Sequence, residues 1–273
     1  MYGTAWKEEQ TQRLTELALE QGFRGIDTAN QRRHYYEAAV GQGIATAISN
    51  ELLTREDLFL QTKFTFRGGQ DHRLPYDPRA SITDQVAQSL ASSLDHLNVE
   101  SIDSFVLHGP SQRSGLGADD WEAWRAMELL HDKGIVRFLG VSNVDSRQLD
   151  QLVNNARIKP TFVQNRCFAI HGWDRQIRTI CAKHGLTYQG FSLLTANREV
   201  LASRFVKQLA TTYGRTIPQV VFRFAFDLGM IILTGTNSAE HMLDDLAIDD
   251  FRLSTEEITQ LENIGIRPSA DAD

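Results

Sequence analysis

The sequence has little cysteine and no long hydrophobic run. Only Cys167 and Cys181 occur among its 273 residues, which indicates reduced structural thiols rather than a disulfide framework, a metal site or a cysteine nucleophile. No apolar stretch approaches the roughly 20 residues needed to cross a bilayer, and the N-terminus has no basic flank followed by an apolar stretch. We therefore expect a cytoplasmic protein without metal and without membrane contact.

The sequence also lacks any block of one charge sign. Its formal net charge is -7, its isoelectric point is about 5.6, and its Lys and Arg residues are scattered along the chain. This distribution argues against nucleic acid or an anionic membrane surface as a partner. Any anionic ligand must be held by a local group of residues.

No Gly-, Pro- or Ser-rich linker, internal repeat or low-complexity tract divides the chain. With 41% hydrophobic residues the sequence can bury a large core, so we expect a single domain over residues 1–273. The length is typical of a closed α/β barrel, which commonly needs roughly 250 residues. The Gly-rich motif GxGxxG is also missing, which disfavours an open doubly wound sheet.

Short runs rich in Val, Ile, Leu and Phe alternate with longer segments of helical period. One such segment, SITDQVAQSLASSLDHL (81–97), repeats apolar residues at spacings of three and four, as expected for a helix that packs on a sheet. The alternation predicts a (β/α)8 TIM barrel. We expect its strands at Tyr2–Thr4, Arg24–Asp27, Leu58–Lys63, Ile102–Leu107, Val136–Val141, Phe162–Gln164, Tyr188–Phe191 and Met230–Leu233.

The first of these strands is clipped, because it begins almost at the initiator Met. Either the protein starts upstream of this Met, or the barrel tolerates a short strand and an uncovered N-terminal floor. Two long connections, 64–80 and 109–120, follow the third and fourth strands. Connections at strand C-termini form the rim of the catalytic face in such barrels, so we expect them to contact substrate.

Polar residues end several of the otherwise apolar strands. Asp27 ends the second strand, Lys63 ends the third, His108 ends the segment SIDSFVLH of the fourth, and Tyr35 opens the helix after the second. Each alone is compatible with an ordinary capping, surface or loop role. Because the C-terminal ends of barrel strands converge on one site, their joint occurrence there indicates acid–base chemistry.

These four residue types can act together as acid–base groups. A free tyrosine has a pKa of about 10, and an adjacent ammonium such as that of Lys63 should bring it closer to neutral pH. Asp27 would keep the buried Lys63 charged and in place. His108 could then hydrogen-bond the substrate oxygen.

The chain resembles the aldo-keto reductase superfamily at these residues and in this order. GFRGIDTA looks like the Asp-bearing strand, FLQTKF like the Lys strand, SLDHLNVESIDSFVLH like the helix and His strand, and KGIVRFLGVSN like the following cofactor strand. The resemblance implies a catalytic tetrad of Asp27, Tyr35, Lys63 and His108. It implies that hydride passes from NADPH, or NADH, to an aldehyde or ketone while the tyrosine donates the proton.

The tyrosine motif departs from the family pattern. Most relatives have YGNE shortly after the Asp, whereas this chain has the longer segment ANQRRHYYEAAVG. Counting back from Glu37 places His34 at the usual tyrosine position, and a branch with HYNE- or HYFE-like motifs uses the residue after the His. We therefore expect Tyr35 to be the donor, with Tyr36 as the alternative.

The resemblance also implies cofactor contacts. Ser142, Asn143 and Gln164 would hold the carboxamide, Phe191 would stack on the nicotinamide ring, and a turn at a helix start after the eighth strand would bind phosphate. In NADPH-preferring relatives this turn carries a Lys and later an Arg, but here those positions are Gly235 and His241, which weakens the electrostatic case for NADPH. The full expected set is Thr4, Ser142, Asn143, Gln164, Phe191, Ser192, Leu193, Gly235, Thr236, Asn237, Ser238, His241 and Asp245.

Substrate specificity is expected to depend on the loops. Trp6, Phe64, Phe66 and Trp173 could line an apolar mouth, and the short tail after Leu261 predicts an open, permissive site. We expect a monomer or weak dimer whose partner is a small carbonyl compound. Two rival interpretations are a nicotinamide-binding regulatory subunit, like the potassium-channel β-subunits, and an inactive cofactor-binding barrel.

Overall fold

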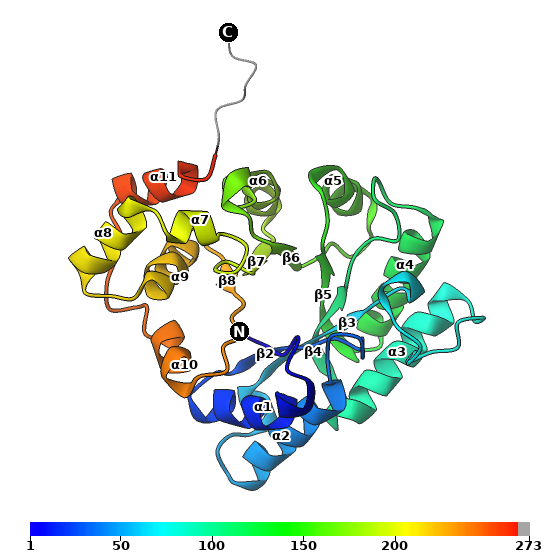
Figure 1. The fold of residues 1–273 in the computed structure, drawn as a ribbon. Helices are drawn as coiled ribbons and strands as arrows, with labels where there is room; N and C mark the ends of the chain where they lie inside the picture. Colours follow the sequence, from blue (N-terminus) through cyan, green and yellow to red (C-terminus); the bar gives the residue numbers. More distant parts are fainter. Residues whose placement is uncertain (267–273) are drawn as a thin grey trace.

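The computed structural model describes residues 1–266, and eight parallel strands form its sheet in the order of the sequence. Figure 1 shows the strands curled inside a ring of helices. This is the predicted (β/α)8 architecture. The strands are β1 (Tyr2–Gly3), β2 (Gly25–Asp27), β3 (Phe59–Phe64), β4 (Ile102–Leu107), β5 (Val136–Ser142), β6 (Phe162–Arg166), β7 (Thr187–Phe191) and β8 (Ile231–Ile232).

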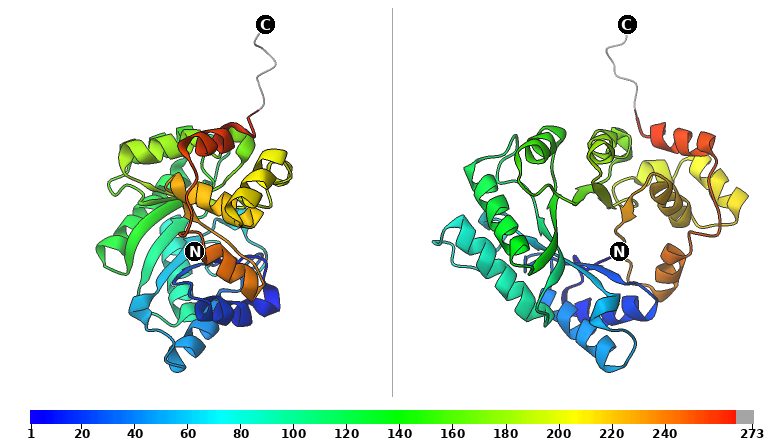
Figure 2. Two further views of the ribbon diagram at one scale, coloured as in Figure 1. Left: turned by 90° about the vertical axis from the view of Figure 1, so that its left-hand side faces the viewer. Right: turned by 180° about the vertical axis from the view of Figure 1, so that it is seen from behind.

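Helices cover the outside of the sheet, as the turned views in Figure 2 also show. None of the helices within residues 1–266 is long and apolar enough to cross a membrane. The α-helices are α1 (Thr11–Glu20), α2 (Glu37–Ser49), α3 (Ile82–Leu97), α4 (Ala118–Asp132), α5 (Ser146–Asn155), α6 (Arg175–His184), α7 (Arg198–Leu201), α8 (Arg204–Tyr213), α9 (Ile217–Asp227), α10 (Ala239–Leu246) and α11 (Thr255–Asn263). Short 3-10 turns η1 (Glu8–Gln10), η2 (Arg55–Asp57), η3 (Arg67–Gly69) and η4 (Ala169–His171) join some of them.

The sheet closes between its last and first strands. Thr234, two residues after β8, pairs in parallel with Tyr2. The Gly3 N–H donates to the Thr234 carbonyl at 2.7 Å, and the Thr234 N–H donates to the Met1 carbonyl at 3.1 Å. As predicted, β1 is very short, and it is joined to β2 by only two residue pairs.

One close helix–helix contact depends on a glycine. A Cβ built on Gly41 of α2 would lie 2.0 Å from the backbone oxygen of His96, in the last turn of α3. The two helices can therefore approach this closely only because residue 41 has no side chain. Next to this contact, the buried Glu37 carboxylate bonds the Thr62 hydroxyl and lies 3.2 Å from His96 Nδ1.

Candidate active site

A cavity of about 1480 Å³ opens at the C-terminal ends of the strands. Asp27, Ser142 and Phe191, which each end a strand, line it together with His108, which follows β4. The two long connections contribute Phe66, Arg67, Gly68 and Gly69 from one, and Gly109, Pro110, Ser111 and Asp119 from the other. The volume exceeds the 300–1,000 Å³ of common small-molecule pockets, so it can hold a dinucleotide together with a substrate.

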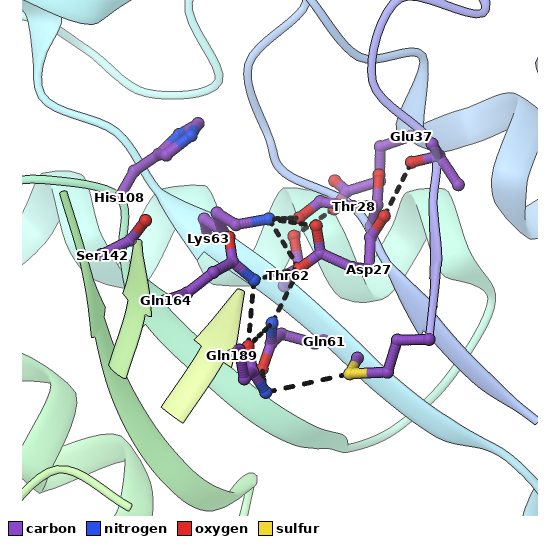
Figure 3. A network of polar contacts seen from close by, with 12 residues as sticks. Asp27, Thr28, Glu37, Gln61, Thr62, Lys63, His108, Ser142, Gln164 and Gln189 are labelled. Atoms are coloured by element: carbon purple, nitrogen blue, oxygen red, sulfur yellow. Dashed lines mark hydrogen bonds and ion pairs between the residues drawn. The ribbon is translucent and has the colours of Figure 1, made fainter. Parts of the chain in front are cut away.

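Asp27 and Lys63 form a buried ion pair below this cavity. Lys63 Nζ lies 2.7 Å from both carboxylate oxygens and donates to the Thr28 carbonyl at 2.8 Å (Figure 3). Burial lowers the pKa of the Lys63 ammonium, and the Asp27 charge acts in the opposite direction. The carboxylate therefore helps to keep the buried ammonium charged.

The structure places Tyr35, and not Tyr36, on the cavity. Tyr35 lies with its ring centroid 5.2 Å from Lys63 Nζ and 5.9 Å from the His108 ring centroid. Tyr36 precedes α2 and stacks under the Arg32 guanidinium at 4.1 Å. Of the two alternatives, only Tyr35 is within reach of the other polar residues.

The pKa of Tyr35 moves in the direction opposite to the one expected. Burial, and then the negative charge of Asp27, raise the pKa of its phenol above the usual value. The Lys63 ammonium, which is bonded to Asp27 and Thr28, does not outweigh these two effects. Tyr35 is consequently held as a neutral phenol that carries its proton.

His108 is a neutral imidazole with one ring nitrogen engaged. Burial, with the charge of Lys63, lowers its pKa to about 3. The Thr65 hydroxyl lies 2.7 Å from Nδ1, and Asn143 Nδ2 donates to the backbone oxygen of His108 at 2.7 Å. These contacts fix the ring and leave Nε2 for a ligand oxygen.

Most of the expected cofactor residues line the same cavity. The Asn143 side chain donates through Nδ2 to Ser142 Oγ at 3.1 Å, which leaves Asn143 Oδ1 and the Ser142 hydroxyl proton for a ligand. Burial raises the pKa of the Asp245 carboxyl to about 6. The cavity-lining members of the expected set are Ser142, Asn143, Gln164, Phe191, Ser192, Leu193, Gly235, Thr236, His241 and Asp245.

Three expected cofactor residues do not line the cavity. Thr4 is fully buried and donates its hydroxyl to the Asp27 carbonyl, while Ser238 accepts from the His241 N–H and so caps α10. Asn237 Oδ1 accepts from Lys7 Nζ at 2.6 Å, and the same ammonium bonds the Gly235 carbonyl. The structure thus supplies a cation from outside the turn, where no cation was expected.

Two expected substrate residues are core residues instead. Phe64 is fully buried against Phe66 and Tyr76, because it adjoins Lys63 in β3 and neighbouring strand residues point to opposite faces. Trp173 is fully buried on Phe224 and donates its indole N–H to the Leu261 carbonyl. The prediction that Phe64 and Trp173 line the substrate pocket is therefore wrong.

Trp6 and Phe66 do line the cavity. Trp6 is 68% exposed, and its ring lies 4.0 Å from that of His34. The two long connections place Gly68, Gly69 and Gly109 on the wall beside the bulkier Phe66 and Pro110. This part of the cavity therefore combines one exposed indole with both small and bulky residues.

Three polar residues next to the site were not predicted from the sequence. Gln61 and Gln189 are fully buried in the barrel interior, and Thr65 contacts His108. Gln61 precedes Lys63 by two positions, so the strand period of two could have placed it on the same inward face. Thr65 follows β3 in a connection whose path no periodicity predicts.

Comparison with known proteins identifies the family. The model of the Aldo/keto reductase family matches residues 2–266. The aldo-keto reductase AKR2E4 of Bombyx mori is 30% identical over 89% of this chain and 79% of its own length. Methylglyoxal reductase DkgA of Escherichia coli (strain K12) is 26% identical over 98% of this chain and 90% of its own.

Solved structures agree with this match. The crystal structure of the Bombyx mori aldo-keto reductase AKR2E4 in complex with NADP superposes with a TM-score of 0.81 at 26% identity, covering 97% of this chain and 88% of that one. The aldose reductase structure from Schistosoma japonicum shares the fold, with a TM-score of 0.82 at 22% identity over 98% of this chain and 89% of that one. The chain belongs to the aldo/keto reductase family.

Proposed function

We propose that this protein reduces aldehydes and ketones to alcohols with a reduced nicotinamide dinucleotide, with NADPH as the principal cofactor and NADH as a possible one. The observation that carries the proposal is the set of hydrogen-bonding groups left unused around Ser142, Asn143 and Gln164. The proposed reaction type rests on family membership, and the proposed roles of the residues rest on the geometry of the site.

These unused groups complement a carboxamide. Ser142 retains a hydroxyl proton that can be donated to a carbonyl oxygen, whereas Asn143 and Gln164 retain side-chain oxygens that accept from N–H groups. A nicotinamide carboxamide offers one acceptor oxygen and two N–H donors. The donor set therefore fits this group, and the Phe191 ring beside it can stack on the pyridine ring.

The other end of the cavity suits phosphate. Gly235 and Thr236 lead into α10, whose free N–H groups and dipole favour anions, and His241 lies in its first turn. The Lys7 ammonium lies behind this turn. The related Bombyx mori enzyme was solved with NADP, which supports the assignment of NADPH.

The candidate catalytic residues can supply the proton. When bound, the reduced nicotinamide provides the hydride for the carbonyl carbon. His108 Nε2 can hold the carbonyl oxygen, and Tyr35 can donate its phenolic proton to that oxygen as negative charge develops. Lys63, held by Asp27, then stabilises the phenolate that Tyr35 becomes.

We also propose a permissive substrate range, because the cavity is large and glycines form part of its wall. A cytoplasmic location, a single domain over 1–273 and a monomeric or weakly dimeric state are further proposals, supported by composition alone.

The proposal is tested by mixing the protein with NADPH and a panel of activated aromatic and short aliphatic aldehydes, and by following the absorbance of the reduced cofactor. Tyr35→Phe should lower kcat by about 100-fold or more while leaving the cofactor Kd within about twofold, because only proton donation is lost. Tyr36→Phe is the matched control and should remain active.

If a folded sample binds NADPH but none of the carbonyl compounds in the panel causes its oxidation, the proposal is contradicted. That result would favour a regulatory subunit or an inactive barrel. Loss of turnover in Tyr36→Phe rather than Tyr35→Phe would move the donor by one residue.

A further inference from the structure

Three glutamine side chains lie together inside the barrel, beneath Asp27. Gln61 comes from β3, Gln164 from β6 and Gln189 from β7, and they are 0%, 3% and 0% exposed (Figure 3). Burying an amide costs free energy unless its polar atoms are hydrogen-bonded. Their partners therefore determine how each amide is turned.

Two of the amides donate to the Asp27 carboxylate. Gln61 Nε2 lies 2.7 Å and Gln164 Nε2 lies 3.0 Å from Asp27 Oδ1. The Lys63 ammonium occupies the same carboxylate from the other side. Because an ionised carboxylate only accepts hydrogen bonds, both glutamines must present nitrogen rather than oxygen to it.

Gln189 completes the network from the far side. Its Oε1 accepts from Gln61 Nε2 at 2.8 Å and from Gln164 Nε2 at 3.0 Å. Its own Nε2 donates to Gln61 Oε1 at 3.0 Å, next to the Met1 sulfur. A reversed Gln189 amide would place N–H groups against N–H groups, so its orientation is fixed by its neighbours.

The consequence falls on Gln164, the one member of the trio that lines the cavity. Both of its N–H groups are used below, on Asp27 and Gln189. Its Oε1 has no hydrogen-bond partner among residues 1–266 and remains for a ligand. If the amide turned over, it would lose two hydrogen bonds and direct its oxygen at an anion.

We infer that Gln61 and Gln189 are positioning residues, which hold the Gln164 oxygen toward the cavity as an acceptor for a ligand N–H. Gln189 accepts directly from the Gln164 amide, and Gln61 holds both Gln189 and the Asp27 oxygen to which Gln164 donates. The inference rests on the proposed function, in which that N–H belongs to the nicotinamide carboxamide. A purely structural network would stabilise the barrel without setting which ligand group is preferred.

The test compares the Kd of NADPH with that of its 3-acetylpyridine analogue, in which a methyl group replaces the carboxamide nitrogen. Fluorescence quenching measures both without turnover. We expect wild type to bind NADPH about tenfold or more tightly than the analogue, since a ligand that leaves a buried polar group unpaired is strongly disfavoured. In Gln189→Leu, where the Gln164 amide keeps Asp27 but loses the second of its two acceptors, this ratio should fall at least about threefold.

Two further variants separate positioning from stability. Gln189→Glu keeps an oxygen for both amide donors and, when protonated, a donor for Gln61, so it should restore the ratio. Val153→Ala, in the buried face of α5 away from the network, should lower the melting temperature but keep the ratio. Gln189→Met serves as the apolar variant if Gln189→Leu does not fold.

An unchanged ratio in Gln189→Leu or Gln189→Met, with a melting temperature lowered as in Val153→Ala, would overturn the inference. Equal binding of NADPH and the analogue by wild type would overturn it while leaving the proposed reductase intact. Binding of neither dinucleotide would reject both.

Discussion

At the scale of single residues, burial decides the protonation states of the site. Tyr35 and His108 lie beside each other, yet burial raises the pKa of the first and lowers that of the second, because it disfavours the charged form of each. The result is a neutral phenol beside a neutral imidazole. Such a pair can donate hydrogen bonds to a carbonyl oxygen without an added charge.

The neutral His108 predicts a pH dependence of stability. An unfolded histidine has a pKa of about 6.5, and His108 has a pKa of about 3 in the folded protein. Between these values the unfolded chain binds a proton that the folded one does not, so the free energy of unfolding falls as pH falls. Relative to His108→Asn, wild type should lose about 1–2 kcal/mol more between pH 7.5 and pH 5.

Urea unfolding of both proteins at the two pH values measures this difference. Because other buried groups such as Asp245 titrate equally in both, the comparison isolates His108. Parallel pH dependences would show that its imidazole is not kept neutral by the fold.

Site residues could be predicted from the sequence where a polar residue lies at or near the end of an apolar strand. Asp27 ends β2, Lys63 is the last residue but one of β3, and His108 follows β4, and all three strands have clear apolar runs. The side-chain direction of Phe64 was not recognised, and the folding of the segment before α2 was needed to separate Tyr35 from Tyr36. The hydrogen bond between Thr65 and His108 could not be predicted, because Thr65 lies in an irregular connection that has no sequence period.

At the scale of elements, hydrophobic periodicity was a reliable guide. The predicted strand Ile102–Leu107 coincides with β4, and the segment 81–97, predicted to be helical, contains α3. Both have regular apolar spacing and clear polar boundaries. Strand ends elsewhere differ by one or two residues, as at β8, where pairing stops at Ile232. The close approach of α2 to α3 was not predicted, since it depends on one glycine meeting a distant carbonyl.

That approach predicts the effect of Gly41→Ala. Alanine favours a helix over glycine by about 1 kcal/mol, but its Cβ would lie 2.0 Å from the His96 oxygen, a backbone atom that cannot move alone. Overpacking should prevail and lower the free energy of unfolding by about 1–3 kcal/mol. Gln42→Ala, at the next and exposed position of α2, is the control and should be neutral or stabilising in the same denaturation experiment. If Gly41→Ala and wild type had equal free energies of unfolding, α2 and α3 could move apart without cost to accommodate the Cβ.

At the scale of the whole molecule, the distribution of charge disfavours the binding of a highly anionic ligand. The chain carries a net charge of -7, and Glu240, Asp244 and Asp245 line the phosphate end of the cavity. Two groups oppose them there, His241 on the cavity wall and the Lys7 ammonium behind the turn. A Cβ at Gly235 would lie 3.6 Å from Lys7 Nζ, so the ammonium lies beside the place where a side chain at 235 would begin.

This arrangement predicts a small preference for NADPH. The Kd of NADPH should be lower than that of NADH by about fivefold or less, because a solvent-screened ion pair contributes about 1 kcal/mol at most. Lys7→Met should bring the two values together, whereas Lys183→Met, on the exposed face of α6, should not. Fluorescence titration of wild type and both variants with NADPH and with NADH measures these Kd values. Tighter binding of NADH by wild type would contradict the role given to Lys7.

The short β1 has a consequence for how the barrel moves. Its neighbours hold it through two residue pairs on one side and one bridge on the other, so local opening of the ring should be least costly there. Thr234 belongs both to this junction and to the turn proposed to bind phosphate. A dinucleotide that orders the turn would therefore also lower the rate at which the barrel opens, which makes cofactor occupancy a determinant of the lifetime of the folded enzyme.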